Sequence, residues 1–125
     1  MFVIAKGENV FSIKQMQYQK LSNLERNLAK LKDSIKFSKN VYIIYDMTDA
    51  MIRFDAKMRN IIIDFLLESE NIRHVAFILS SDLVVNSSIN ILSKRITNTE
   101  TSINESYEIA MRRINYSRMQ FIENS

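Results

Sequence analysis

The chain has 125 residues, which suffices for one domain with a single hydrophobic core. Its composition, 46% hydrophobic and 25% charged, is typical of a soluble globular protein. There is no cysteine, which excludes disulfides, thiolate nucleophiles and cysteine-based zinc sites, and a single histidine cannot build a histidine-rich metal centre.

The chain also lacks proline, and Gly7 is its only glycine, so the sequence does not favour a glycine-rich phosphate-binding loop. The formal net charge of +3 is unevenly spread, because residues 1–39 carry eight basic and three acidic side chains while residues 40–125 carry nine and eleven. No apolar run approaches the roughly 18 residues that span a bilayer, and the first residues lack the pattern of a signal peptide. We therefore expect a cytoplasmic protein with no cofactor and no membrane segment.

The first third of the chain predicts a strand and a long helix. Residues 2–6 are expected to form an edge strand, because they are apolar and are followed by the turn signal around Gly7. From about Phe11 to Lys36 the pattern is helical, since apolar residues recur every three or four positions on one stripe. That stripe consists of Leu21, Leu24, Leu28, Leu31 and Ile35, and the opposite face carries Lys20, Glu25, Arg26, Lys30, Lys32 and Lys36. A coiled coil would need a longer repeat, so packing on a sheet is favoured.

The middle third contains the most apolar segment, Val41–Met47, with the sequence VYIIYDM. Such a run predicts a strand that is covered on both faces, at the centre of a parallel sheet. A polar loop from Thr48 to Arg53 follows, and then an amphipathic helix that ends near Glu68 or Ser69. Its apolar face is expected to consist of Phe54, Met58, Ile61, Ile62, Phe65 and Leu66.

The last third predicts two more strands and two more helices. His74–Leu79 is a second buried strand, closed by Ser80, Ser81 and Asp82, and residues 97–103 are a weak final strand. The third helix would bury Val85, Ile89, Leu92 and Ile96, and the last would bury Tyr107, Ala110, Met111 and Ile114. Ser102 and Glu105 have capping-box spacing, with Asn104 as a rival N-cap, so the last helix is expected to begin there.

The predicted order is βαβαβαβα, in a single domain that covers residues 1–125. Strands that alternate with helices of this length predict an α/β sandwich with right-handed crossovers and a largely parallel four-stranded sheet, covered by amphipathic helices.

Four short segments carry a resemblance to a known family. Ile43–Thr48 (IIYDMT) resembles an apolar strand that ends in an Asp-hydrophobic pair, and Arg53–Asp55 (RFD) resembles the start of the next helix. His74–Ser80 resembles the following strand, and Ala110–Ile114 resembles an Ala-Leu-x-Trp-Leu ending, with Arg113 in place of Trp. Over roughly residues 40–115 the chain thus resembles the STAS (SpoIIAA-like) domain, shared by anti-sigma-factor antagonists and the cytoplasmic tails of sulfate transporters.

The resemblance implies a scaffold without the switch of that family. In kinase-controlled antagonists this helix opens with Asp-Ser-Ser-Gly, and a serine there is phosphorylated. Here the matching positions are Asp55, Ala56, Lys57 and Met58, and neither Ala56 nor Lys57 has the hydroxyl group that phosphorylation requires.

Four acids are candidates for chemistry at the carboxyl edge of the sheet, where open α/β folds bind ligands. They are Asp46, Asp49, Asp55 and Asp82, whose carboxylates would suit Mg²⁺ or a phosphoryl group. A receiver domain would also need an acid pair after the first strand and a lysine after the last, and the sequence has only Glu8 at the first and no lysine in residues 97–103. Helix caps and hydrogen bonds to loop amides are therefore the favoured roles of these acids.

Hydroxyl and imidazole groups give weaker signals. Thr48, Ser80 and Ser81 lie at the same predicted edge as potential phosphoacceptors, but no general base is nearby, so loop hydrogen bonding is favoured. His74 begins its strand at the opposite edge, where a titrating switch is conceivable. A partly exposed histidine without a functional role is the favoured interpretation.

Two helix faces suggest partners. The basic face of the first helix, with Arg112, Arg113 and Arg118, would suit nucleic acid, but aromatic side chains are not interleaved with the basic ones and solvation is favoured. The last helix continues past its core stripe with Tyr116, Met119, Phe121 and Ile122, which either wrap the domain or support a homodimer.

The main hypothesis is a non-enzymatic STAS-like protein-interaction module in bacterial signalling or regulation. Its contact surface would be the loop after the central strand and the start of the next helix, where the resemblance places partners: Thr48, Asp49, Arg53, Asp55, Lys57, Met58 and Arg59. The alternatives are a small-ligand or lipid-binding module on the same fold, a degenerate receiver-like phosphotransfer domain and a nucleic-acid-binding protein.

Overall fold

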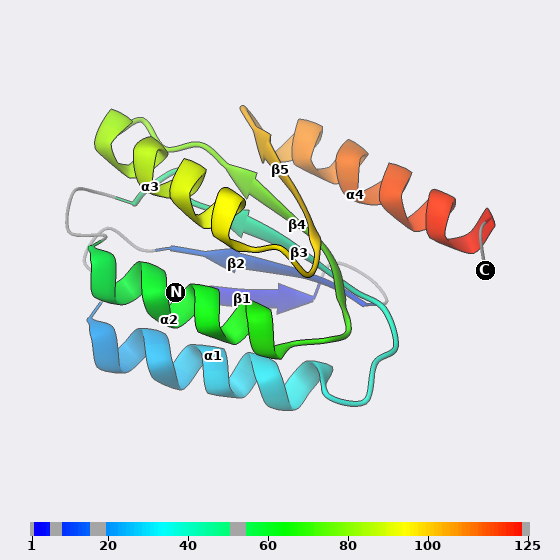
Figure 1. Cartoon of the computed structure of the whole chain (residues 1–125). Coiled ribbons are helices and arrows are strands. Elements are labelled where there is room, and N and C mark those ends of the chain that lie inside the picture. The colour runs from blue at the N-terminus through cyan, green and yellow to red at the C-terminus, as the bar shows by residue number, and fades with distance from the viewer. Residues whose placement is uncertain (1, 6–8, 16–19, 51–54, 124–125) are drawn as a thin grey trace.

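The computed structural model describes residues 2–5, 9–15, 20–50 and 55–123, which form strands and helices arranged around one sheet (Figure 1). In chain order the elements are β1 (Phe2–Ala5), β2 (Val10–Lys14), α1 (Leu21–Ile35), β3 (Val41–Asp46), α2 (Ala56–Glu68), β4 (Ile72–Ile78), α3 (Leu83–Arg95), β5 (Glu100–Asn104) and α4 (Tyr107–Glu123).

The strands lie in the sheet in the order β1-β2-β3-β4-β5, which is also their order along the chain. β2, β3, β4 and β5 are parallel to their neighbours, whereas β1 pairs antiparallel with β2. The predicted α/β class, with four parallel strands that alternate with four helices, is therefore confirmed. The sheet has β1 as an additional antiparallel strand.

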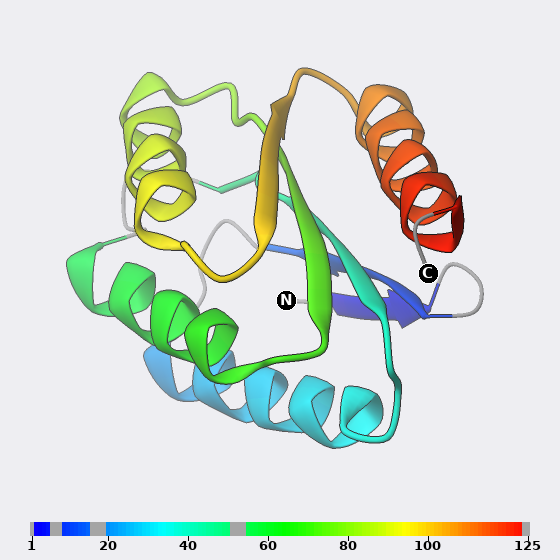
Figure 2. The same ribbon diagram turned by 45° about the vertical axis from the view of Figure 1, so that its right-hand side comes forward.

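The helices form two unequal layers. α1, α2 and α3 cover one face of the sheet, and α4 covers the other (Figure 2). Alternation along the strands sorts the side chains, so that Ile43 and Tyr45 of β3 pack in the larger core, while Tyr42 and Ile44 pack in the smaller core below α4. Crossovers of one hand between successive neighbouring strands place their helices on the same face, which explains the grouping of α1, α2 and α3.

The central strand is where the sequence places it. β3 lies between β2 and β4, and both of its faces are covered by helices. Large side chains fill the space between the sheet and the helices: the rings of Tyr45 and Phe77, both fully buried, have centroids 5.9 Å apart. This packing favours a filled interior over the ligand cavity of the alternative hypothesis.

The first helix is shorter than predicted. Val10–Lys14, part of which was assigned to that helix, is a strand that pairs with β3, and α1 begins only at Leu21. The segment alternates between faces, since Ile13 packs in the larger core and Val10 in the smaller one. Asn9 makes the preceding turn with a φ angle of 66°, a left-handed conformation that asparagine tolerates better than most residues. A five-residue strand was thus merged with the helix that follows it.

The last helix also begins later than predicted. Ser102 and Asn104, the two expected N-caps, both lie within β5 and are buried. Ser106 provides the cap instead, because its Oγ accepts a hydrogen bond of 3.2 Å from the backbone N–H of Ile109. Ser102 and Asn104 therefore do not cap α4. They belong to β5, on the side of the sheet that α4 covers.

Candidate functional site

The carboxyl edge of the parallel strands brings together the loops that were predicted to carry function. β2 ends at Lys14, β3 at Asp46 and β4 at Ile78, and the segments after β3 and β4 lie side by side at this edge. Lys14 Nζ forms an ion pair of 3.0 Å with Asp49 Oδ2. This contact raises the pKa of Lys14, through the hydrogen bond and the charge of Asp49.

The four predicted acids have separate local roles. Asp46 Oδ1 accepts hydrogen bonds from the backbone N–H (2.9 Å) and the hydroxyl of Thr48. Asp55 caps α2 through the N–H of Met58 at 3.0 Å, and Asp82 caps α3 through the N–H of Val84 at 2.9 Å. Among the described residues no three acidic or histidine side chains are grouped so that they could hold a metal ion. Capping and turn formation, the favoured interpretation, account for three of the acids.

Ser80 connects the two loops of this edge. Its buried hydroxyl donates to the carbonyl oxygen of Ala50 at 2.8 Å and accepts from the N–H of Asp82 at 3.0 Å. Asn86 adds two hydrogen bonds to the backbone of Ser80, at 2.8 and 2.9 Å. The hydroxyl of Ser80 is therefore part of a rigid loop junction, while Ser81 and Thr48 are exposed.

Two exposed apolar side chains lie at the same edge, where the sequence did not predict them. Leu83 and Val84, the first residues of α3, are 79% and 55% exposed. The apolar periodicity identifies Val85 and Ile89 as buried, and both are fully buried. The periodicity does not predict whether Leu83 and Val84 are buried. Their exposure results from their position at the start of α3.

The predicted partner-binding residues are only partly accessible. Thr48, Asp49, Asp55 and Lys57 are exposed, as a contact surface requires. Met58 is only 7% exposed and packs in the core, so the apolar contact expected of it is wrong.

Arg59 and Arg53 are the other two residues of the predicted contact surface. Arg59 is half-buried and its Nη1 donates a hydrogen bond of 3.0 Å to Ser88 Oγ, which ties the first turns of α2 to α3. Arg53 lies outside the described residues.

His74 is buried, which contradicts the partly exposed position predicted for it. Its side chain is covered by α4, and the residue is 1% exposed. Nδ1 lies 2.7 Å from Ser117 Oγ of α4, and Nε2 lies 2.8 Å from Ser102 Oγ of β5. The strand begins two residues earlier than predicted, at Ile72, so that His74 lies inside the sheet. Both hydroxyl groups come from elements distant in sequence, which periodicity cannot reveal.

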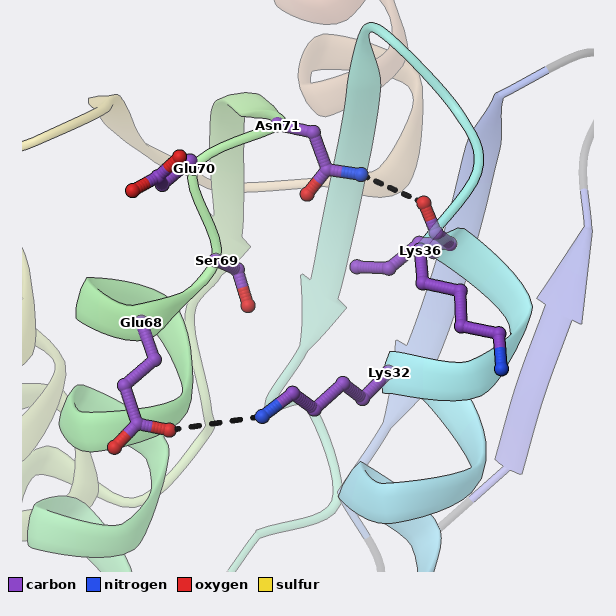
Figure 3. Close-up of a pocket in the computed structure, with 7 residues that line it drawn as sticks. Lys32, Lys36, Glu68, Ser69, Glu70 and Asn71 are labelled. Atoms are coloured by element: carbon purple, nitrogen blue, oxygen red, sulfur yellow. Dashed lines mark hydrogen bonds and ion pairs between the residues drawn. The ribbon is translucent and has the colours of Figure 1, made fainter.

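The opposite edge of the sheet has a shallow depression of about 290 Å³, between the ends of α1 and α2 (Figure 3). Lys32 reaches across it to Glu68, with a distance of 3.9 Å between Nζ and Oε2. Asn71 Nδ2 donates to the carbonyl oxygens of Ile35 at 2.6 Å and Ser38 at 2.9 Å. The pair of Lys32 and Glu68 thus connects α1 with α2, and Asn71 connects the end of α1 with the loop before β4.

The basic face of α1 is also partly neutralised. Lys36 lies 4.0 Å from Asp33, in addition to the pair between Lys32 and Glu68. Arg26 and Lys30 are exposed on the same helix. Solvation and local ion pairs therefore account for this face, in line with the favoured interpretation.

The structure is that of an α/β protein with four parallel strands and one antiparallel edge strand, in which the loops after β3 and β4 meet at Ser80. None of its described helices has the length and apolar character that crossing a membrane requires. No family model matches the chain, and no curated protein or solved structure matches it either.

Proposed function

We propose that this chain is a cytoplasmic, non-enzymatic protein-interaction module of the STAS-like kind, with a role in bacterial signalling or regulation. Its contact surface is the carboxyl edge of the sheet. The observation that carries the proposal is the exposure of Leu83 and Val84 beside the exposed polar residues Thr48 and Asp49, across the junction made by Ser80.

An apolar pair with a polar surround is the usual composition of a protein-binding surface. Leu83 and Val84 are consecutive exposed apolar residues in the first turn of α3, and they would supply the apolar contacts of the surface. Lys57, exposed in the first turn of α2, adds a charge on the neighbouring helix, which the hydrogen bond from Arg59 to Ser88 joins to α3.

The surface is also well ordered, which lowers the entropic cost of binding. Asp82 caps α3 immediately before Leu83, and Asn86 fixes the backbone of Ser80. The anchor residues therefore project from a helix end whose backbone is held by at least four hydrogen bonds.

The element order that carries the resemblance supports the same proposal. A buried strand that ends in Asp46 is followed by a polar loop and by α2, then by a strand that leads to Ser80, and finally by the closing helix α4. The start of α2 has Ala56 and Lys57 where the switched members have serines, so partner binding here is not controlled by a phosphoserine at these positions.

The test is affinity capture from the native cell with the full chain as bait. The double variant Leu83→Ala/Val84→Ala and the variant Lys57→Glu are expected to lose the protein that the unmodified chain retains. Phe37→Ala is a matched control, because Phe37 is 91% exposed just beyond the end of α1, at the opposite edge. Retention of the same proteins by all three variants would remove this surface from consideration.

α4 offers a second surface, for a homodimer. Tyr116 and Met119 are 63% and 62% exposed on the side of α4 that faces away from the sheet. We propose that two copies associate through this face. Sedimentation at micromolar concentration should then give a dimer for the unmodified chain and a monomer for Tyr116→Ser/Met119→Ser, and a monomer in both cases would refute the dimer.

A further inference from the structure

α4 packs on its face of the sheet through an apolar core and through one buried network of hydrogen bonds. Within the described part of the protein, the apolar core under α4 is much smaller than the core under α1, α2 and α3. Its buried members are Val10, Tyr42, Ile44, Ala76, Ile78, Ala110 and Ile114. Since α4 alone packs on this core, its release would uncover these residues.

His74 is the centre of those polar groups, because it joins three elements. The imidazole belongs to β4, its Nε2 contacts Ser102 of β5 at 2.8 Å, and its Nδ1 contacts Ser117 of α4 at 2.7 Å. Ser117 is the side chain through which α4 reaches this network, and its hydroxyl continues to Glu100 Oε2 at 3.4 Å.

The proton positions follow from the two ends of the chain of hydrogen bonds. Asn104 Nδ2 donates to Ser102 Oγ at 3.0 Å, which leaves the Ser102 proton available to Nε2 of His74 as the acceptor. At the other end the Glu100 carboxylate can only accept, so Ser117 donates to it and receives the Nδ1 proton of His74. The network fits a neutral imidazole with its proton on Nδ1.

A protonated imidazole does not fit the same network. With a proton on Nε2, Ser102 Oγ would face two donors, His74 and Asn104, and its own proton would need a new acceptor. The buried Oδ1 of Asn104 has no hydrogen bond within the described residues and would be such an acceptor. Turning the amide to present it would remove the donor of the Phe77 carbonyl oxygen, which Asn104 Nδ2 contacts at 3.1 Å. Protonation of the ring therefore requires the hydrogen bonds of Ser102 and Asn104 to rearrange.

The charges around the ring do not offset this cost. Burial is the largest influence and lowers the pKa of His74 below its usual value. Glu100 of β5, with Oε2 3.6 Å from Nδ1, opposes the shift, whereas Arg113 of α4 adds to it. Tyr42 faces His74 from β3 and is uncharged near neutral pH, since burial raises its pKa.

We propose that His74 is an acid-operated latch for α4: the neutral ring ties α4 to the sheet, and protonation of the ring releases the helix and uncovers the apolar sheet face beneath it. This inference does not rest on the proposed function. A histidine freed from the network would regain a pKa near 6.5. The fraction of molecules with α4 released should then rise as the pH falls below about 6.5, by about tenfold per pH unit, and should level off at the lower pKa of the closed state.

The test is amide hydrogen exchange of the full chain between pH 7.5 and pH 5, corrected for the intrinsic pH dependence of exchange. α4 amides are expected to lose protection at least tenfold more than α2 amides over this range, and His74→Gln is expected to abolish that difference. Equal changes in α2 and α4 of the unmodified chain would overturn the proposal.

Two exposed residues give a matched pair that does not disturb the core. Glu100→Gln should lower the pKa of His74, as measured by NMR of the imidazole, and extend the loss of α4 protection to a lower pH. Arg113→Gln should raise that pKa and make the loss level off at a higher pH. Shifts of the α4 profile that do not follow the pKa of His74 in these two variants would refute the latch.

Discussion

Tyr45 and Gln15 form a hydrogen bond inside the larger core, with 3.1 Å between the phenolic Oη and Gln15 Oε1. Tyr45 is 1% exposed on β3, and burial raises its pKa, so the hydroxyl stays protonated and donates. Gln15 follows β2, and its backbone N–H also donates to the carbonyl oxygen of Asp46 at 2.9 Å. The pair thus fixes the exit of β2 against the central strand.

Tyr45→Phe should therefore destabilise the protein. The substitution removes only the hydroxyl group. It leaves the buried Gln15 Oε1 without its donor, which costs about 1–2 kcal/mol. Urea unfolding followed by circular dichroism measures the difference. Tyr116→Phe, on the exposed face of α4, is the control and should change stability by less than about 0.5 kcal/mol. Equal effects of the two variants would contradict the role of the Tyr45 hydroxyl.

Asp55 should contribute to stability as the N-cap of α2. Asp55→Ala removes the acceptor of the Met58 N–H and should cost about 1 kcal/mol, whereas Asp55→Ser should retain most of the stability. Asp64→Ala, at an exposed position within the same helix, serves as the control and should be neutral or slightly stabilising. If Asp55→Ala and Asp55→Ser are equally stable in thermal unfolding, the cap is not important.

Asn71 should link the end of α1 to the loop before β4. Asn71→Ala removes a side chain that donates to two backbone carbonyl groups, and a loss of about 1–2 kcal/mol is expected in urea unfolding. Asn71→Asp should be more harmful near neutral pH, because a carboxylate would face the same carbonyl oxygens. Lowering the pH to 3 should narrow the difference between the two variants, since a protonated carboxyl group can donate one hydrogen bond.

The ion pair of Lys14 and Asp49 should affect titration more than stability. Asp49→Asn removes the hydrogen-bonded charge that raises the pKa of Lys14, so that pKa should fall towards its ordinary value. NMR titration of the Lys14 side chain would show this. Both side chains are exposed by about half, so the unfolding midpoint should hardly move. An unchanged Lys14 pKa would mean that the pair does not persist in solution.

The sequence predicts the elements whose signal is long and repeated. Val41–Met47 is apolar over nearly its whole length, as expected of a strand covered on both faces, and β3 is such a strand. The stripe from Leu24 to Ile35 marks the buried face of α1 in the same way. In contrast, Val10–Lys14 is too short for its alternation to be recognised next to a strong helical pattern, so it was merged with α1.

The features that remained hidden depend on contacts between distant segments. The burial of His74 requires hydroxyl groups from β5 and α4, and the exposure of Leu83 depends on the loop that Ser80 and Asn86 fix. Capping by Asp55 follows from local chemistry and was among the favoured roles. The kinship with STAS domains stays a prediction, since short patterns carry it and no family model matches.

The five strands lie in the sheet in the same order as they occur in the chain. This order affects how the polypeptide can fold during synthesis. As the nascent chain leaves the ribosome, each new strand of the series can pair with the one made just before it. No strand must wait for a later one to be inserted between its neighbours, so exposed sheet edges are covered progressively. α4, which follows β5 in the chain, then covers the second face of the sheet.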